Sequence, residues 1–259
     1  MSHRHFHATT AAICSALLLA LPPLATAGDW QPSGTDIGYE IDGEAFEGYL
    51  SKADGEARGT VLLVHDWDGI DDYERQRADM LARMGYDTFA VDLYGEGNRP
   101  QETGAKKAET QRLYRDRARM QALTAGGLDF ARSRGVPEET VVMGYCFGGA
   151  VVLEAARNGL LDDVRGYATF HGTLATPEDQ RWQNPDAPVL IAHGGADSMI
   201  SMDDVATLSR ELEAVDATYE IEVYSGAPHA FTVFDTARYQ ERADRKSWGA
   251  FTDLLEEAF

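Results

Sequence analysis

The sequence predicts an α/β fold, a doubly wound, mostly parallel sheet with helices on both faces. Short unbroken apolar runs such as Thr60–Val64 are typical of strands that are buried on both faces of a parallel sheet. Segments with helical spacing of apolar residues separate these runs, and strands that alternate with helices indicate a parallel sheet. No repeat, low-complexity stretch or Pro/Ser-rich linker divides residues 28–259, so we expect one domain there.

The composition and net charge indicate which classes of molecule this protein can bind. The chain has 259 residues, of which 44% are hydrophobic, enough to bury a large core. It carries 23 basic and 43 acidic side chains, a formal net charge of −20. Since this charge repels phosphates and anionic head groups, we expect no nucleic-acid partner and no membrane partner. We expect a monomer that acts on a small molecule.

Residues 1–27 have the pattern of a secretory signal peptide. A basic start at Arg4 precedes the uncharged apolar run Ala11–Leu21, and Ala25-Thr-Ala27 places small residues before a cut at Gly28. The alternative is an N-terminal membrane anchor, but the run is shorter than the roughly 20 residues that span a bilayer, and Pro22-Pro23 interrupts it. We therefore predict export to the periplasm or out of the cell, with cleavage near Ala27.

The first elements follow from apolar runs and helical spacing. An edge hairpin is expected from Ile37–Ile41 and Ala45–Leu50, before the buried strand at 60–64. The segment Tyr73–Met84 has helical spacing and ends at Gly85, since glycine commonly closes a helix. Thr88–Val91 is again a short apolar run and predicts a second buried strand.

One long helix is predicted over Ala105–Arg134. Apolar residues recur there at near-helical spacing, and arginines occupy mostly other faces of the helix. Gly135 follows its last turn and is expected to cap it. The apolar positions are Leu113, Met120, Leu123 and Phe130, and the arginines are Arg112, Arg115, Arg117 and Arg119.

The rest of the chain continues the alternation of strand and helix. Ligands of a doubly wound sheet bind at the carboxyl ends of its strands, so the residues that follow each strand are the first to search for chemistry. The expected strands are Thr140–Met143, Gly166–Phe170, Val189–Ala192 and Thr218–Tyr224, and the expected helices are Gly149–Asn158, Asp203–Val215 and Lys246–Phe259.

A cysteine stands in a glycine-flanked turn after the strand at 140–143. Gly144-Tyr-Cys146-Phe-Gly148 is the nucleophile elbow of the α/β-hydrolase fold, with sulfur in place of the usual serine oxygen. The turn exposes the thiol at a helix N-terminus, where the dipole favours a thiolate, and leaves the N–H of Phe147 free for an oxyanion. A phosphate-binding turn would need glycine at position 146, and an inert core cysteine is the other alternative.

An acid and a base follow in the chain order that this fold uses, which is nucleophile, acid, base. Asp197 lies a few residues beyond one predicted strand, and His229 lies a few residues beyond the next. Loops at those strand ends can converge on the thiol. Asp203 and Asp204 are alternatives for the acid, although they stand where a helix N-cap is expected. We interpret His193 as structural.

With these residues in place, the sequence resembles the dienelactone hydrolases. The resemblance covers most of residues 28–259, and its most specific motif is Gly144-Tyr-Cys-Phe-Gly-Gly149. It implies a triad that attacks an ester or lactone carbonyl, with Cys146 as nucleophile, His229 as base and Asp197 as the orienting acid. It also implies an oxyanion hole made by the N–H groups of Phe147 and Trp67, and neither a cofactor nor a metal. The other shared motifs are His65-Asp-Trp-Asp-Gly69, Asp92-Leu-Tyr-Gly95, Phe170-His-Gly172 and Gly226-Ala-Pro-His-Ala-Phe231.

Two positions depart from the family pattern. The family binds the carboxylate of its lactone acid with arginines, one of them four residues after the catalytic histidine, where this chain has Val233. A second arginine could come from Arg112, Arg115 or Arg117, or these could simply face solvent. Asp66 stands where the family has a glutamate that contacts the resting thiol. We expect Asp66 to restrain the thiol in the same way, and the alternative is that it only caps the loop before the next helix.

The sequence therefore predicts an exported hydrolase of small esters or lactones that works through a Cys-His-Asp triad and a thioacyl-enzyme intermediate. His171, after a predicted strand, is expected to line the same pocket or to be structural. Two rival functions stay open. One is a non-catalytic periplasmic binding protein on the same fold. The other is a thiol redox sensor, since residues 28–259 carry one cysteine, although no resolving cysteine accompanies it.

Overall fold

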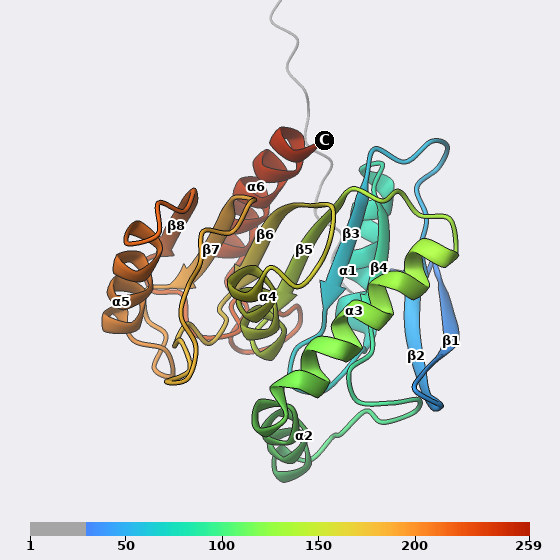
Figure 1. Ribbon diagram of the computed structural model, residues 1–259, viewed down its shortest axis with the longest axis horizontal. Helices are drawn as coiled ribbons and strands as arrows, with labels where there is room; N and C mark the ends of the chain where they lie inside the picture. The colour runs from blue at the N-terminus through green and yellow to red at the C-terminus, as the bar shows by residue number, and fades with distance from the viewer. Residues whose placement is uncertain (1–29) are drawn as a thin grey trace, which may run out of the picture. The chain divides into compact units, whose positions relative to one another are not determined.

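The described part of the chain forms an eight-stranded sheet. A computed structural model (Figure 1) describes residues 30–259, so the predicted signal peptide of residues 1–27 lies outside the described residues. The strands lie in the order β1-β2-β4-β3-β5-β6-β7-β8. They are β1 (Thr35–Ile41), β2 (Glu44–Ser51), β3 (Thr60–Val64), β4 (Asp87–Val91), β5 (Thr140–Tyr145), β6 (Val164–Phe170), β7 (Val189–Gly194) and β8 (Tyr219–Tyr224).

The strand order reverses around β3. β1 and β2 form an antiparallel hairpin, and β2 pairs antiparallel with β4. The pairs from β4 to β8 are all parallel, with β3 between β4 and β5. The chain passes from β3 to β4 on one side and returns to β5 on the other, so the topological switch point of this doubly wound sheet lies at the carboxyl ends of β3 and β5. There Val64 pairs with Gly144, two residues before Cys146.

Helices cover both faces of the sheet, as predicted. In Figure 1, α3, α4 and α5 lie on one face, and α1 and α6 lie on the other. Each face buries its own apolar cluster, with Leu128, Val152 and Leu208 in the first and Leu81 and Phe251 in the second. The helices are α1 (Asp72–Arg83), α2 (Thr103–Arg115), α3 (Arg117–Ser133), α4 (Phe147–Asn158), α5 (Met202–Glu213) and α6 (Glu241–Ala258).

The prediction of one long helix over residues 105–134 is wrong. The segment forms two helices, α2 and α3, which are separated by Asp116 with φ −119° and ψ 72°. The Asp116 side chain accepts the N–H of Arg119 at 2.9 Å, so it is the N-cap residue of α3. Aspartate favours this cap position over a helix interior, which explains why the apolar spacing runs through a break.

The other predicted strands and helices are present, with some shifted ends. α4 begins at Phe147, directly after the elbow, and α6 begins at Glu241, earlier than the predicted start at Lys246. Sequence periodicity therefore located the elements well and their first turns less well.

No helix within residues 30–259 has the length and apolar character needed to cross a bilayer.

Candidate active site

Cys146 lies between β5 and α4 in a strained turn. Its backbone has φ 50° and ψ −109°, a conformation that few residues other than glycine adopt. A Cβ on Gly144 would lie 2.4 Å from the carbonyl of Gly148, and a Cβ on Gly148 would lie 2.3 Å from the carbonyl oxygen of Val64 in β3. Only glycine fits at both positions. The predicted elbow is therefore present, and it holds the sulfur at the carboxyl end of the sheet.

The structure brings the three predicted triad side chains into contact. His229 Nε2 lies 3.1 Å from Cys146 Sγ, and His229 Nδ1 lies 2.8 Å from Asp197 Oδ2. Asp197 follows β7 and His229 stands between β8 and α6, so three separate loops meet at one edge of the sheet. The other carboxylate oxygen of Asp197 accepts the N–H groups of Met199 (2.8 Å) and Ile200 (3.1 Å). These two bonds fix the carboxylate that faces the imidazole.

The surroundings favour a protonated thiol in the resting site. Burial raises the pKa of the Cys146 thiol above its ordinary value and the charge of Asp66 raises it further, whereas a bond from the Phe147 N–H lowers it. Burial alone would raise the pKa of Asp197, but its bonds from His229 and from two backbone N–H groups hold that pKa below the ordinary value. A protonated sulfur thus faces an imidazole that is held by a charged carboxylate.

The alternative acids, Asp203 and Asp204, lie in the first turn of α5. Asp204 Oδ2 accepts the backbone N–H (2.8 Å) and the hydroxyl (2.7 Å) of Ser201, and Asp203 lies in the same first turn of α5. Ser201 is the N-cap residue of that helix, not either aspartate. His193 is buried in β7, and burial lowers its pKa. Among the candidates for the acid, Asp197 is the residue bonded to His229.

Asp66 lies on the β3–α1 loop, residues 65–71, and its side chain is buried. Its Oδ1 accepts the N–H of Asp68 at 3.1 Å, so it also stabilises the turn of the loop. Burial raises the pKa of Asp66 well above its ordinary value, and the neighbouring Asp68 raises it further. The cap of α1 is a different residue, Asp71, which accepts the N–H of Tyr73 at 2.6 Å. Asp66 therefore shapes the loop and places a carboxyl group near the thiol.

Trp67 follows Asp66 at the expected oxyanion position. Its carbonyl accepts the Tyr94 hydroxyl at 3.2 Å, and its ring centroid lies 5.3 Å from Lys106 Nζ. Lys106 in turn pairs with Asp68 at 2.8 Å. Within residues 30–259 the N–H of Trp67 donates to no protein acceptor, as an oxyanion donor requires.

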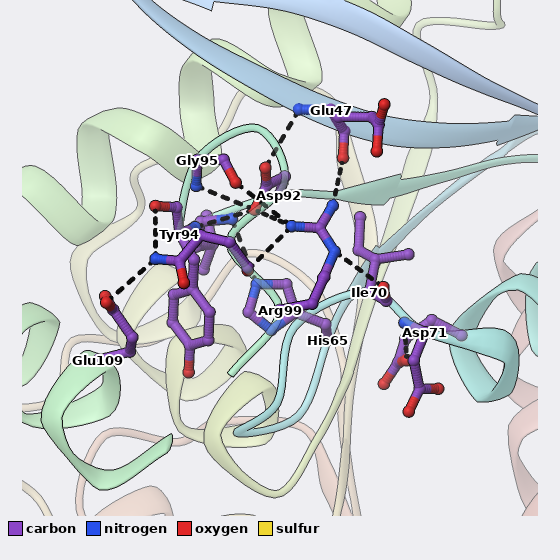
Figure 2. Close-up of polar contacts among 12 residues, drawn as sticks. Glu47, His65, Ile70, Asp71, Asp92, Tyr94, Gly95, Arg99 and Glu109 are labelled. Atoms are coloured by element: carbon purple, nitrogen blue, oxygen red, sulfur yellow. Dashed lines mark hydrogen bonds and ion pairs between the residues drawn. The ribbon is translucent and has the colours of Figure 1, made fainter. Parts of the chain in front are cut away.

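Arg99 anchors the β3–α1 loop through hydrogen bonds and an ion pair (Figure 2). Its guanidinium donates to the carbonyls of Ile70 and Glu47, both at 2.9 Å, and lies 3.5 Å from a carboxylate oxygen of Asp92. These bonds tie β2, the end of β4 and the β3–α1 loop together. Because the loop carries the expected oxyanion donor, Arg99 supports the site without touching the sulfur.

The three arginines considered for carboxylate binding are bonded to other side chains. Val233, at the position of the family's arginine, is a half-buried apolar residue. Arg112 and Arg117 are paired with carboxylates, whereas Arg115 is bonded only to a neutral amide. The bonds are Arg112 to Glu109 (2.9 Å), Arg115 to Gln111 (3.4 Å) and Arg117 to Glu154 (2.7 Å).

His171 is fully buried beside His229. The two ring centroids are 5.3 Å apart, and His171 Nε2 lies 2.8 Å from the hydroxyl oxygen of Thr232. Sequence reasoning missed Thr232 and Lys106, because a threonine among apolar residues and a lysine on an exposed helix carry no chemical signal of their own. The position of Thr232, three residues after His229, was the one available hint.

Two cavities in the described part of the chain lie apart from the triad residues. They have volumes of about 340 and 480 Å³ and lie at the start of β6 and beside α5, and neither is lined by a triad residue. Within the described part of the chain, no group of three or more His, Cys, Asp or Glu side chains is placed to hold a metal ion.

Comparison with known sequences identifies relatives of this chain. Residues 46–259 match the sequence model of the dienelactone hydrolase family. A relative from Mus musculus, named carboxymethylenebutenolidase homolog, is 25% identical over 199 residues, which make up 75% of this chain and 79% of that protein. The family match therefore covers strands β3 to β8, the elbow and the loops that carry Asp197 and His229.

Solved structures share the fold. The crystal structure of P91, described as a dienelactone hydrolase-like promiscuous phosphotriesterase from metagenomic libraries, has a TM-score of 0.78 at 23% identity, over 88% of this chain and 98% of that one. A thermophilic esterase from Thermogutta terrifontis has a TM-score of 0.64 at 15% identity, over 87% and 92% of the two chains. The predicted α/β-hydrolase fold is thereby confirmed.

Proposed function

The chain belongs to the dienelactone hydrolase family and is a hydrolase of esters or lactones, and on this premise we propose that it is exported and cleaves small esters or lactones through a triad of Cys146, His229 and Asp197. The observation that carries the proposal is the line of contacts from Asp197 through His229 to the sulfur, 2.8 and 3.1 Å long. It ends at the strained elbow, where a nucleophile is held at the substrate crevice.

The geometry supports a two-step acyl transfer. His229 Nε2 takes the thiol proton as the sulfur attacks the carbonyl carbon, and Asp197 stabilises the imidazolium that forms. The N–H groups of Phe147 and Trp67 bind the oxyanion. Collapse of the tetrahedral intermediate breaks the bond to the leaving oxygen, which receives the imidazolium proton, and leaves the acyl group on sulfur. His229 then takes a proton from a water whose oxygen bonds to the acyl carbon, the carbon–sulfur bond breaks to release the acid, and the imidazolium returns its proton to the sulfur.

The thioacyl intermediate provides the direct test. Mixing with excess p-nitrophenyl acetate and quenching in acid should leave an acetyl group on the peptide that contains Cys146, detected by mass spectrometry. A burst of p-nitrophenol equal in amount to the enzyme should accompany it. Binding of esters and lactones without any turnover would favour the non-catalytic binding protein instead. Oxidation of the sulfur without turnover would favour the redox sensor.

Neutral substrates are expected to compete well with acidic ones. Val233 removes one arginine contact to a substrate carboxylate, which is worth roughly 1.5–3 kcal/mol, or about ten- to a hundred-fold in binding. We therefore expect kcat/KM for the methyl ester of a lactone acid to equal or exceed that for the acid in the same buffer. Val233→Arg should move the preference toward the acid. A clear preference of the wild type for the acid would contradict this expectation.

Asp66→Asn should make Cys146 easier to ionise. A carboxylate near the sulfur disfavours a second negative charge, so its removal lowers the pKa of the thiol. The midpoint of the pH profile for alkylation by iodoacetamide should therefore move down. Because burial raises the pKa of Asp66 itself, the difference from wild type should be largest at pH values above that raised pKa, where the carboxyl group is charged.

Asp72→Asn is the matched control for this experiment. It removes the same charge from the first turn of α1, where the side chain is 88% exposed, and should leave the alkylation profile unchanged. An unmoved or upward-moved midpoint in Asp66→Asn would show that Asp66 does not restrain the thiol.

Export predicts a defined N-terminus. The mature protein should begin at or near Gly28, which intact-mass measurement of the protein in a periplasmic fraction checks. Ala27→Arg removes the small residue before the cut and should leave the leader attached. Recovery of the wild-type chain from that fraction with Met1 still in place would contradict the proposed cleavage.

A further inference from the structure

The hydroxyl of Thr232 joins two side chains from distant parts of the sequence. Its oxygen lies 2.6 Å from the hydroxyl of Tyr73 in α1 and 2.8 Å from Nε2 of His171, which follows β6. Thr232 is 1% exposed and His171 is 0% exposed. A hydroxyl can satisfy both neighbours at once, as donor to one and acceptor from the other, which no alkyl side chain of this size can do.

The backbone of Thr232 is held by a buried ion pair. Arg77 of α1 donates to the Thr232 carbonyl at 2.9 Å and pairs with Asp244 of α6. The rings of Phe234 and Trp248 lie 4.2 and 4.9 Å from the guanidinium carbon. Since a buried charge is costly to separate from its partner, the carbonyl of Thr232 has little freedom to move.

His171 extends this anchorage to the imidazole of His229. The two rings meet edge to face, with centroids 5.3 Å apart and an interplanar angle of 64°. Burial lowers the pKa of His171 well below its ordinary value, and the charge of His229 lowers it further, while Asp197 opposes and Arg77 reinforces the shift. His171 is therefore a neutral ring that packs against His229 without adding a positive charge.

We propose that Thr232 is a positioning residue for His229, and that it acts by fixing the ring of His171, which keeps His229 Nε2 directed at Cys146 Sγ. The inference rests on the proposed function, in which His229 is the base. Thr232 touches neither the sulfur nor the triad carboxylate, so its effect passes through the ring contact. A shift of about 1 Å in such a contact can cost on the order of a hundredfold in rate.

Thr232→Val and Thr232→Ser separate the hydroxyl from the volume of the side chain. The valine keeps the shape and removes both hydrogen bonds, whereas the serine keeps the hydroxyl. We expect kcat for p-nitrophenyl acetate to fall about tenfold in Thr232→Val with KM within about twofold of wild type, and to recover in Thr232→Ser. The loss falls on kcat because orientation of the base matters in the transition state and not in substrate binding.

The pH profile of Cys146 alkylation gives a readout that needs no substrate. In Thr232→Val the misdirected imidazole accepts the thiol proton less readily, so the midpoint should move up. In Thr232→Ser it should stay at the wild-type value. A role confined to stability would instead lower the Tm of Thr232→Val and leave the midpoint where it is.

Wild-type kcat and midpoint in Thr232→Val would overturn the proposal, as would a serine variant that is impaired as much as the valine variant. If Thr232→Val does not fold, Tyr73→Phe removes the support at the other end of the hydroxyl and should move kcat and the midpoint in the same directions. No movement there overturns the proposal as well.

His229→Ala, measured alongside, separates a failure of the positioning role of Thr232 from a failure of the proposed function. An inactive His229→Ala together with a wild-type-like Thr232→Val rejects the positioning role alone. An active His229→Ala rejects the proposed function.

Discussion

Cys146→Ala should lower kcat for p-nitrophenyl acetate by about 10³-fold or more, because it removes the atom that bonds to the acyl carbon in the proposed mechanism. The N–H groups of Phe147 and Trp67 stay in place, so some acceleration over the uncatalysed reaction should persist. The alanine retains the Cβ that the strained turn already accommodates, so the fold should survive. Initial rates check the prediction, with circular dichroism to show that the variant is folded.

The same assay tests whether the three side chains act as one unit. His229→Ala should be about as inactive as Cys146→Ala, and the double variant should lose little more than either single variant. Cys146→Ser is the matched control, since it fits the same turn and keeps a weaker nucleophile, and its activity should lie above that of the alanine variant. Losses that multiply in the double variant would indicate that Cys146 and His229 act independently.

The elbow could be predicted from the sequence because its constraint is local. Gly144 and Gly148 stand two residues before and after Cys146, and each is required by a backbone contact that any Cβ would violate. Strand periodicity placed that turn at the carboxyl edge of the sheet, and the same rule placed Asp197 and His229 after two other strands at that edge. The position of a residue that follows a buried strand can thus be predicted from its place in the chain as well as from its chemistry.

Other features depend on contacts that no local pattern reports. Asp116 interrupts an otherwise helical segment because its side chain caps α3, while the apolar spacing around it continues. The function of Arg99 as an anchor follows from carbonyl groups of two distant segments. Thr232 acquires its contacts only when α1 and the end of β6 pack on either side of it. The partners of Arg99 and Thr232 lie far away in the sequence. The cap at Asp116 interrupts a regular spacing of apolar residues, which hides it.

Asp197→Asn should lower kcat by about 10²- to 10⁴-fold while leaving the fold intact. The asparagine carbonyl can still accept the N–H groups of Met199 and Ile200, so the loop should keep its shape. Its amide then faces His229 Nδ1 and donates to it, which places the imidazole proton on Nε2. A protonated Nε2 directed at the sulfur cannot take the thiol proton, and no charge remains to stabilise an imidazolium. Steady-state rates over a pH series check this prediction.

Asp204→Asn distinguishes loss of this tautomer control from a general loss of negative charge. Asp204 belongs to the cap of α5 and bonds to Ser201, so its variant should retain kcat and lose only some thermal stability. Full activity in Asp197→Asn together with a large loss in Asp204→Asn would transfer the acid role to the helix cap. The 2.8 Å contact between Asp197 and His229 argues for the opposite outcome, because a carboxylate at that distance and with both oxygens bonded holds the imidazole in the one tautomer that can accept a proton from sulfur.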